Sequence, residues 1–314
     1  MNKIHLDTDL GGDIDDICAL AMLLRWPDVD FAGITTVAEE NGRRAGYVRY
    51  VLALEARKDI PVAAGADVSG GFYRVTPGLP PEERYWPERI LPSPNPVEEA
   101  LVLLRNSIEQ GATIVGIGPY TNFYLLDLKY PGILRQAKLF LMGGYIYPAR
   151  PGFPKMGNDM DYNIQVDSKS ARHVIENSKP TLIPLSVTVE TSLRRAYLDD
   201  LRASGELGQL IAGQAEIFAE DEQNETRYGG TCEGLPPDTI NFQHDPLACA
   251  IALGWNEGVE IAEVPLILEE KDGWLIERIS DSGNPIRLVT KVDGASFNQF
   301  WIHRVTTHGK SGKK

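Results

Sequence analysis

Five carboxylates lie within ten residues near the start of this chain, and their crowding is the strongest chemical signal in the sequence. Asp7 and Asp9 end an apolar run and, two apart on extended backbone, point to the same side. Asp15 and Asp16 open the next segment, after a turn that two glycines permit. Like charges this close raise one another's pKa unless a cation neutralises them. The segment therefore predicts a site for Ca²⁺ or Mg²⁺, which prefer oxygen ligands, rather than for Zn²⁺.

Helix capping is the simpler interpretation of the same segment. Asp13 or Asp15 would cap the following helix, and the other carboxylates would be solvated. Capping accounts for one or two carboxylates and leaves the rest unexplained. The spacing also differs from that of an EF-hand loop, in which acids alternate and a glutamate stands at position twelve. We therefore prefer a metal site of another geometry.

Four segments spread over most of the chain resemble motifs of the inosine-uridine nucleoside hydrolase family. The acidic segment is similar to the family's N-terminal signature, in a variant with two extra residues before the Asp-Asp pair. The other segments are Gly-Pro-Tyr-Thr-Asn at 118–122, Asp-Tyr-Asn-Ile-Gln-Val-Asp at 161–167 and His-Asp-Pro-Leu-Ala at 244–248. The resemblance implies a calcium-dependent hydrolase that cleaves the N-glycosidic bond of a ribonucleoside to free base and ribose.

The resemblance also assigns the metal and the acid–base chemistry to particular residues. Ca²⁺ would be held by the carboxylates of Asp9, Asp16 and Asp245 and by the backbone carbonyl of Thr121. Asp9 would be the general base that activates the attacking water. His244 would protonate the departing base, because the pKa of histidine lies near neutrality.

Sugar binding is expected from a second set of residues. The resemblance places Asp15 on the 2′-hydroxyl side, with Asp161 and Asn163 on the remaining hydroxyls. An acid and an amide two residues apart can accept from and donate to neighbouring hydroxyls. Asn158 is a looser candidate for a further sugar contact.

Departures from the family pattern gather in the sugar and base pocket. After the second strand the family commonly has Gly-Asn, whereas this chain has Val-Ala-Glu-Glu-Asn, so Asn41, or Glu39 or Glu40 in its place, would contact the sugar. The usual glutamate before Phe-Asn is replaced by the shorter Asp161. Calcium is therefore better supported than the identity of the nucleoside, and a modified nucleoside remains open. The aromatic candidates for stacking on the base are Tyr73, Tyr85, Trp86 and Tyr228.

Short apolar runs alternate with amphipathic segments, which predicts an α/β doubly wound fold with a mostly parallel sheet flanked by helices. Runs that are apolar on both faces are typical of buried parallel strands. A C-terminal β-hairpin is expected around an Asp-Gly turn. Strands are expected at 4–7, 31–37, 112–118, 138–144 and 181–187, helices at 13–26 and 41–57, irregular segments at 69–93 and 216–238, and the hairpin strands at 259–269 and 274–280.

Composition narrows the classes of partner. With 31 Lys and Arg against 44 Asp and Glu the net charge is −13, which argues against nucleic acid as a partner. No apolar run approaches the ~18 residues of a membrane-spanning helix. Three widely spaced cysteines and the lack of a signal-peptide pattern favour a reduced, cytoplasmic protein. We expect one domain over 1–308, a disordered tail over 309–314 and, from the resemblance, a homodimer or tetramer.

Two other functions compete with this interpretation. A haloacid-dehalogenase-like phosphatase also begins with a strand followed by Asp-x-Asp, but its remaining motifs do not stand out, and it leaves the segment at 244–248 unexplained. A non-catalytic nucleoside- or calcium-binding protein on the same fold is the second alternative. Only an activity measurement separates it from the enzyme, since both would bind the metal.

Overall fold

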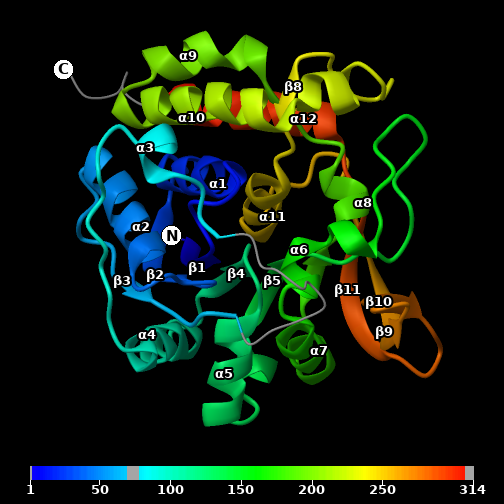
Figure 1. The fold of residues 1–314 in the computed structure, drawn as a ribbon. Coiled ribbons are helices and arrows are strands. Elements are labelled where there is room, and N and C mark those ends of the chain that lie inside the picture. The colour runs from blue at the N-terminus through cyan, green and yellow to red at the C-terminus, as the bar shows by residue number, and fades with distance from the viewer. Residues whose placement is uncertain (1, 69–77, 308–314) are drawn as a thin grey trace.

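A nine-stranded sheet runs through the computed structural model, which describes residues 2–68 and 78–307 (Figure 1). Its strands are β1 (Asn2–Thr8), β2 (Val29–Thr36), β3 (Val62–Ala64), β4 (Thr113–Gly116), β5 (Lys138–Met142), β6 (Thr181–Ile183), β9 (Glu260–Lys271), β10 (Trp274–Ile279) and β11 (Asn284–Lys291). They lie in the order β10-β9-β11-β6-β5-β4-β1-β2-β3. A separate two-stranded sheet joins β7 (Leu193–Arg194) and β8 (Thr239–Asn241).

The sheet is parallel from β3 to β11, and β9 pairs antiparallel with both β11 and β10. The chain runs outward from β1 through β2 to β3, then returns to β4 on the other side of β1 and continues to β6. This reversal makes the carboxyl ends of β1 and β4 a topological switch point, where ligands bind in open α/β sheets. The expected doubly wound, mostly parallel fold is therefore confirmed.

Helices cover both faces of the sheet (Figure 1). The larger apolar core includes residues of α1 (Asp15–Leu24), α2 (Arg43–Leu54), α10 (Glu206–Glu222), α11 (His244–Ala252) and α12 (Gly294–Thr306). The core on the opposite face includes residues of α4 (Val97–Glu109), α5 (Thr121–Lys129) and α7 (Ser168–Asn177). The shorter helices are α3 (Glu82–Tyr85), α6 (Tyr162–Gln165), α8 (Leu185–Thr188), α9 (Leu198–Ala203), η1 (Ile133–Gln136), η2 (Asn158–Met160), η3 (Arg195–Tyr197) and η4 (Glu225–Gly229). None of the helices described is long and apolar enough to cross a bilayer.

Most expected elements are present, with four differences. The segment expected to be irregular at 69–93 contains the short helix α3. The run at 181–187 is a strand only to Ile183 and then turns into α8, because Pro184 lacks the amide that a strand would need. The hairpin of β9 and β10 is extended by β11, which joins it to the parallel strands. The segment at 216–238 begins as the last two turns of α10 and is not irregular there. The expected tail at 309–314 lies outside the described residues.

Candidate active site

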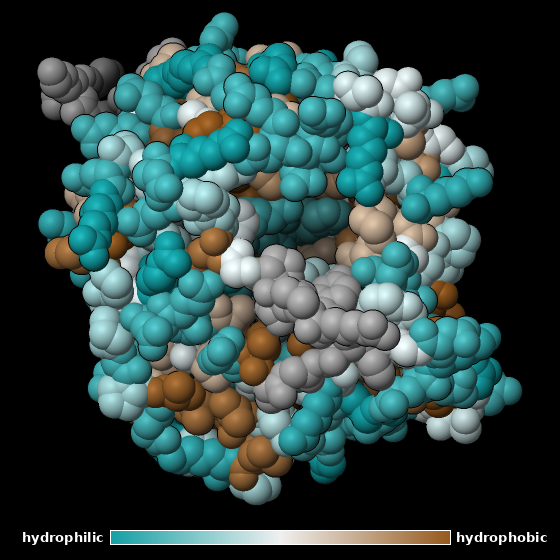
Figure 2. Space-filling view, viewed as in Figure 1, coloured by the Kyte–Doolittle hydropathy of each residue, from teal (hydrophilic) through white to brown (hydrophobic). Residues whose placement is uncertain are grey.

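A cavity of about 530 Å³ opens where the carboxyl ends of β1, β4 and β5 meet the N-termini of α1 and α11. Figure 2 shows it as a hollow in this face of the molecule. Polar side chains from both ends of the chain line it, among them Asp9, Asp15, Asp161, His244 and Asp245. Residues that the linear sequence separates by more than two hundred positions therefore share one pocket.

Three buried carboxylates form the centre of the cavity. One oxygen each from Asp15, Asp16 and Asp245 lies within 4.8 Å of the others. Asp15 and Asp16 are the first residues of α1, and Asp245 stands in the first turn of α11. Both helices therefore direct the positive end of their dipoles at this group.

Hydrogen bonds hold these carboxylates in position, but the donors are uncharged and do not neutralise the carboxylate charge. The Asp245 amide donates to Asp15 over 3.2 Å, and the Thr8 hydroxyl donates to Asp16. Burial, followed by the repulsion among neighbouring aspartates, raises the pKa of all three carboxyls well above the usual range. A buried set of three oxygen ligands with no cationic side chain bonded to it among the described residues fits a hard divalent cation.

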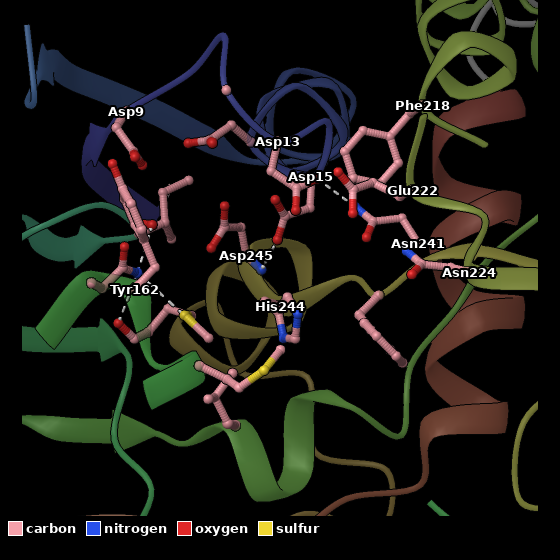
Figure 3. A pocket seen from close by; sticks show the side chains of 18 of the residues that line it. Asp9, Asp13, Asp15, Tyr162, Phe218, Glu222, Asn224, Asn241, His244 and Asp245 are labelled. Atoms are coloured by element: carbon pink, nitrogen blue, oxygen red, sulfur yellow. Dashed lines mark hydrogen bonds between the residues drawn. The ribbon is translucent and has the colours of Figure 1, made fainter. Parts of the chain in front are cut away.

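Asp9 lies apart from these three carboxylates, at the β1 side of the same cavity (Figure 3). The sequence placed Asp9 with the metal ligands and Asp15 with the sugar, whereas the structure groups Asp15 with Asp16 and Asp245. A side chain on Gly118 would come within 2.8 Å of Asp9 Oδ1, so the glycine leaves the space that this carboxylate occupies. Burial raises the pKa of Asp9, and the positive charge of Arg44 partly offsets that effect.

Thr121 begins α5 and is buried. Its hydroxyl donates to Asp167 over 2.6 Å, which holds the start of α5 against the start of α7. The side chain is not among those that line the cavity. The role expected for its backbone carbonyl stays a prediction.

His244 lines the cavity beside the three carboxylates. Its Nδ1 is hydrogen-bonded to the Thr188 hydroxyl over 2.6 Å, and Nε2 bonds to none of the described residues. Burial lowers the pKa of His244 to about 4, so the ring is neutral at neutral pH. The side chain is therefore oriented through one nitrogen and free to contact a ligand through the other.

Asp161 and Asn163 also line the cavity, at the ends of β4 and β5. Asp161 accepts the Gly144 amide through Oδ2 over 2.7 Å, and burial raises its pKa to about 7. The Asn163 amide donates to the carbonyls of Ile117 and Met142, which leaves its oxygen for a ligand. The structure thus brings both expected sugar-binding residues to the pocket.

Several other candidates do not line the cavity. Asn41 is exposed on a left-handed turn, and Glu39 is occupied in accepting the first amides of α2. Glu40 accepts the Leu79 amide. Asn158 instead donates to Glu277 over 3.1 Å.

The four aromatic residues expected to stack on the base lie in different places. Tyr85 and Tyr228 line the cavity. Trp86 does not, because it stacks on Tyr47 with the ring centroids 4.3 Å apart. Tyr73 lies outside the described residues.

Sequence reasoning missed several residues that line the pocket. Arg44 occupies the place expected for Asn41, and its guanidinium donates to the backbone oxygens of Ala38 and Asp9. No signal in the sequence singles out Arg44, because α2 also carries Arg43 and Arg49. Other missed residues include Asp13, Phe218, Glu222, Asn224 and Asn241, four of them from segments in which no chemical motif was recognised.

Comparison with known proteins gives a consistent result. The family model described as inosine-uridine preferring nucleoside hydrolase matches residues 4–299. The pyrimidine-specific ribonucleoside hydrolase RihA of Enterobacter sp. (strain 638) is 29% identical over 266 residues, which cover 79% of this chain and 77% of that protein. The non-specific ribonucleoside hydrolase RihC of Salmonella paratyphi A is 29% identical over 222 residues, covering 66% and 69%.

The fold is also similar to solved structures. A purine-preferring ribonucleoside hydrolase from Gardnerella vaginalis superposes with a TM-score of 0.76 at 20% identity. The match covers 97% of this chain and 98% of that one. It therefore extends over both the parallel strands and the C-terminal antiparallel region.

Proposed function

This chain belongs to the inosine-uridine preferring nucleoside hydrolase family, and on that premise we propose that it hydrolyses the N-glycosidic bond of a ribonucleoside with the help of bound Ca²⁺. The observation that carries the proposal is the group formed by Asp15, Asp16 and Asp245 on the cavity wall, with His244 beside it. Such a site offers a cation, a water and a sugar a common place to bind. The hydrolysis would give free base and ribose.

Cleavage of an N-glycosidic bond passes through an oxocarbenium-like transition state, as in other glycoside hydrolysis. The protein must hold the sugar, deprotonate a water and assist the departing base. Negative charge close to the sugar stabilises the positive charge that develops there. The aspartates that line this cavity supply such charge.

Asp15, Asp16 and Asp245 would hold the cation, with the Thr121 carbonyl as a further expected ligand. When bound, Ca²⁺ lowers the pKa of a coordinated water and fixes the positions of sugar hydroxyls. Asp9, which faces the same cavity without belonging to the group of three, is placed to take a proton from the attacking water. A raised pKa suits that task, since a general base works best when its pKa is near the operating pH.

His244 would assist the leaving base through Nε2. The Thr188 hydroxyl orients the ring, and when it donates to Nδ1 the ring proton resides on Nε2. As negative charge builds up on the departing base, the pKa of His244 would rise, so the ring would take up a proton from solvent and give one to the base through Nε2. Asp161 and the free oxygen of Asn163 would bind sugar hydroxyls.

The relatives differ in the base they act on, since one is named pyrimidine-specific, another non-specific and a structural neighbour purine-preferring. The test is therefore a release assay for reducing sugar across purine and pyrimidine ribonucleosides, in Ca²⁺ and in chelator. We expect ribose release that requires Ca²⁺. If no nucleoside releases ribose, the chain is a nucleoside- or calcium-binding protein on this fold. A cytoplasmic location and a dimeric or tetrameric state stay predictions.

A further inference from the structure

One wall of the cavity presents hydrogen-bond acceptors and very few donors. This acceptor wall consists of Asp13, Glu222, Asn224 and Asn241, which all line the cavity (Figure 3). In this view Glu222, Asn224 and Asn241 lie on the far side of the cavity from Asp9, with Phe218 beside them, and Asp13 lies nearer the centre, beside Asp15. In the proposed function His244 faces the leaving base, so the edge of the base would lie against this wall.

Asn241 has a fixed orientation. The side chain is 3% exposed, and its Nδ2 donates to Asp13. Because a carboxylate only accepts hydrogen bonds, the amide group of Asn241 must face Asp13. The oxygen of Asn241 is therefore the atom left for a ligand, and none of the described residues donates to it.

Asn224 is fixed in the same way. It is 6% exposed, and its Nδ2 donates to the Ile240 carbonyl over 3.1 Å. A carbonyl likewise only accepts, so the amide oxygen again faces away from its partner. No described residue donates to this oxygen either, and two nearly buried amides thus both offer acceptors to the cavity.

Neither carboxylate of the wall is paired with a cationic side chain among the described residues. Asp13 accepts the Asn241 amide and the Ile14 backbone amide through the same oxygen, and the Asp15 backbone amide also hydrogen-bonds its carboxylate. Glu222 ends α10 and forms no ion pair with the described residues. The neighbouring Asp221 differs, since it is paired with Arg84 over 2.6 Å and accepts the Tyr85 hydroxyl over 2.6 Å.

Cations that line the cavity do not cancel this surplus of acceptors. The Arg227 guanidinium carbon lies 4.9 Å from the centroid of the Tyr228 ring, so it is stacked there. Arg44 is held beside Asp9 by the carbonyls of Ala38 and Asp9, across the cavity from the wall. The wall therefore combines two carboxylates with two amide oxygens.

We propose that the acceptor wall selects ribonucleosides whose base carries an exocyclic amino group, with Asp13 and Glu222 as the specificity-determining residues. The inference rests on the proposed function and extends it to a substrate class. An amino group donates two hydrogen bonds, whereas a carbonyl at the same ring position would face the carboxylates acceptor to acceptor. Leaving such buried acceptors unpaired costs enough to reduce turnover of the carbonyl analogue by about ten- to a hundredfold.

Two pairs of nearly isosteric substrates test this directly. Adenosine and inosine differ by an amino group against a carbonyl on the six-membered ring, and the adjacent ring nitrogen is an acceptor in adenosine and a single N–H donor in inosine. Cytidine and uridine differ in the same way, so the amino member offers two donated hydrogen bonds to the wall and the carbonyl member offers one. The quantity to measure is the ratio of kcat/KM within each pair, at saturating Ca²⁺. We expect the amino member to be favoured at least about tenfold in at least one pair.

Two variants and one control locate the effect. Asp13→Asn replaces the carboxylate by an amide that can donate, and it should lower the amino-to-carbonyl ratio at least about tenfold. Glu222→Gln changes a carboxylate on α10 and leaves the hydrogen bond between Asp13 and Asn241 intact. It should lower the same ratio. Glu220→Gln makes the same charge change on α10 outside the cavity lining and should leave the ratio unchanged.

Failure of this inference differs from failure of the proposed function. If the wild type cleaves none of the four nucleosides, the proposed hydrolase function is refuted. If it cleaves them with ratios near one or in favour of the carbonyl member, only the selectivity is refuted. A uniform loss on all four substrates in both variants, with the ratio unchanged, would also refute it, because the discrimination would then persist without these carboxylates.

Discussion

Removing calcium should destabilise the protein, and the effect should grow with pH. Asp15, Asp16 and Asp245 have oxygens within 4.8 Å of one another. At that distance and an effective dielectric constant of about 20, each pair of ionised carboxylates repels by roughly 3 kcal/mol. Without a cation the folded protein relieves this repulsion by retaining protons, which is why the pKa of each carboxyl is raised.

The sign of the pH dependence follows from linkage. These carboxyls have a higher pKa in the folded chain than in the unfolded chain, so the folded state binds more protons above about pH 4. The metal-free protein therefore loses stability as the pH rises from there through the raised folded pKa values. Ca²⁺ requires the ionised carboxylates, so its stabilising effect should increase over the same range.

The size of the shift can be set by mass action. At a free Ca²⁺ concentration of about one hundred times Kd, binding to the folded state alone adds roughly 2.7 kcal/mol. A chain of 314 residues has an unfolding entropy near Tm of about 0.7 kcal/mol per kelvin. Added Ca²⁺ should then raise Tm by about 4 °C at neutral pH.

Thermal unfolding followed by circular dichroism, in chelator and in excess Ca²⁺ at about pH 5 and about pH 8, measures this effect. Asp245→Asn is the matched variant, because it removes one ligand charge from the group of three and should abolish most of the shift. Mg²⁺ serves as the comparison ion. An unchanged Tm with Ca²⁺ at both pH values, or an equal shift in Asp245→Asn, would refute a calcium site at these carboxylates.

Three further substitutions test other parts of the site. Asp9→Asn should lower kcat by about 10²- to 10⁴-fold with little change in Tm, and an assay showing full turnover would remove Asp9 from the role of base. Gly118→Ala would place a methyl group 2.8 Å from Asp9 Oδ1, so we expect a lower kcat while the calcium-dependent shift in Tm persists. Glu277→Gln should flatten the fall in stability between about pH 5 and about pH 8, because burial and the neighbouring Asp161 raise the pKa of Glu277 to about 8 and its proton is lost in that window. Chemical unfolding across that range measures it, and parallel curves for variant and wild type would contradict the shift.

The metal end of the cavity was largely predictable from the sequence, because its residues follow strand ends or open helices in recognisable motifs. Asp16 and Asp245 were both expected as ligands, and the structure places them together. The close approach of Asp15 to Asp245 was not predictable, since it depends on the Asp245 amide donating to Asp15 across 230 residues of sequence. Spacing along a chain does not report such a contact.

The rest of the pocket was harder to predict for two physical reasons. Polarity near the second strand pointed to Asn41 and Glu39, but Glu39 is used to bind the first amides of α2, and the longer Arg44 reaches the cavity from the helix itself. Phe218 and Glu222 lie in a stretch that looked irregular because it is polar, yet α10 continues through it. A polar helix end that faces a ligand carries no apolar periodicity to reveal it.

The loop between β1 and α1 contributes residues both to the metal end of the cavity and to the acceptor wall. Its fixed ends, Asp9 and the Asp15-Asp16 pair, are set by the strand and by the helix, so they hold the metal end in place. The residues between them include Asp13, which accepts a hydrogen bond from Asn241 on β8. A left-handed turn at Gly11, with φ of 115°, makes this path of the loop possible. Lengthening one loop can therefore change the chemistry offered to the base while the carboxylates that would bind the cation stay where they are.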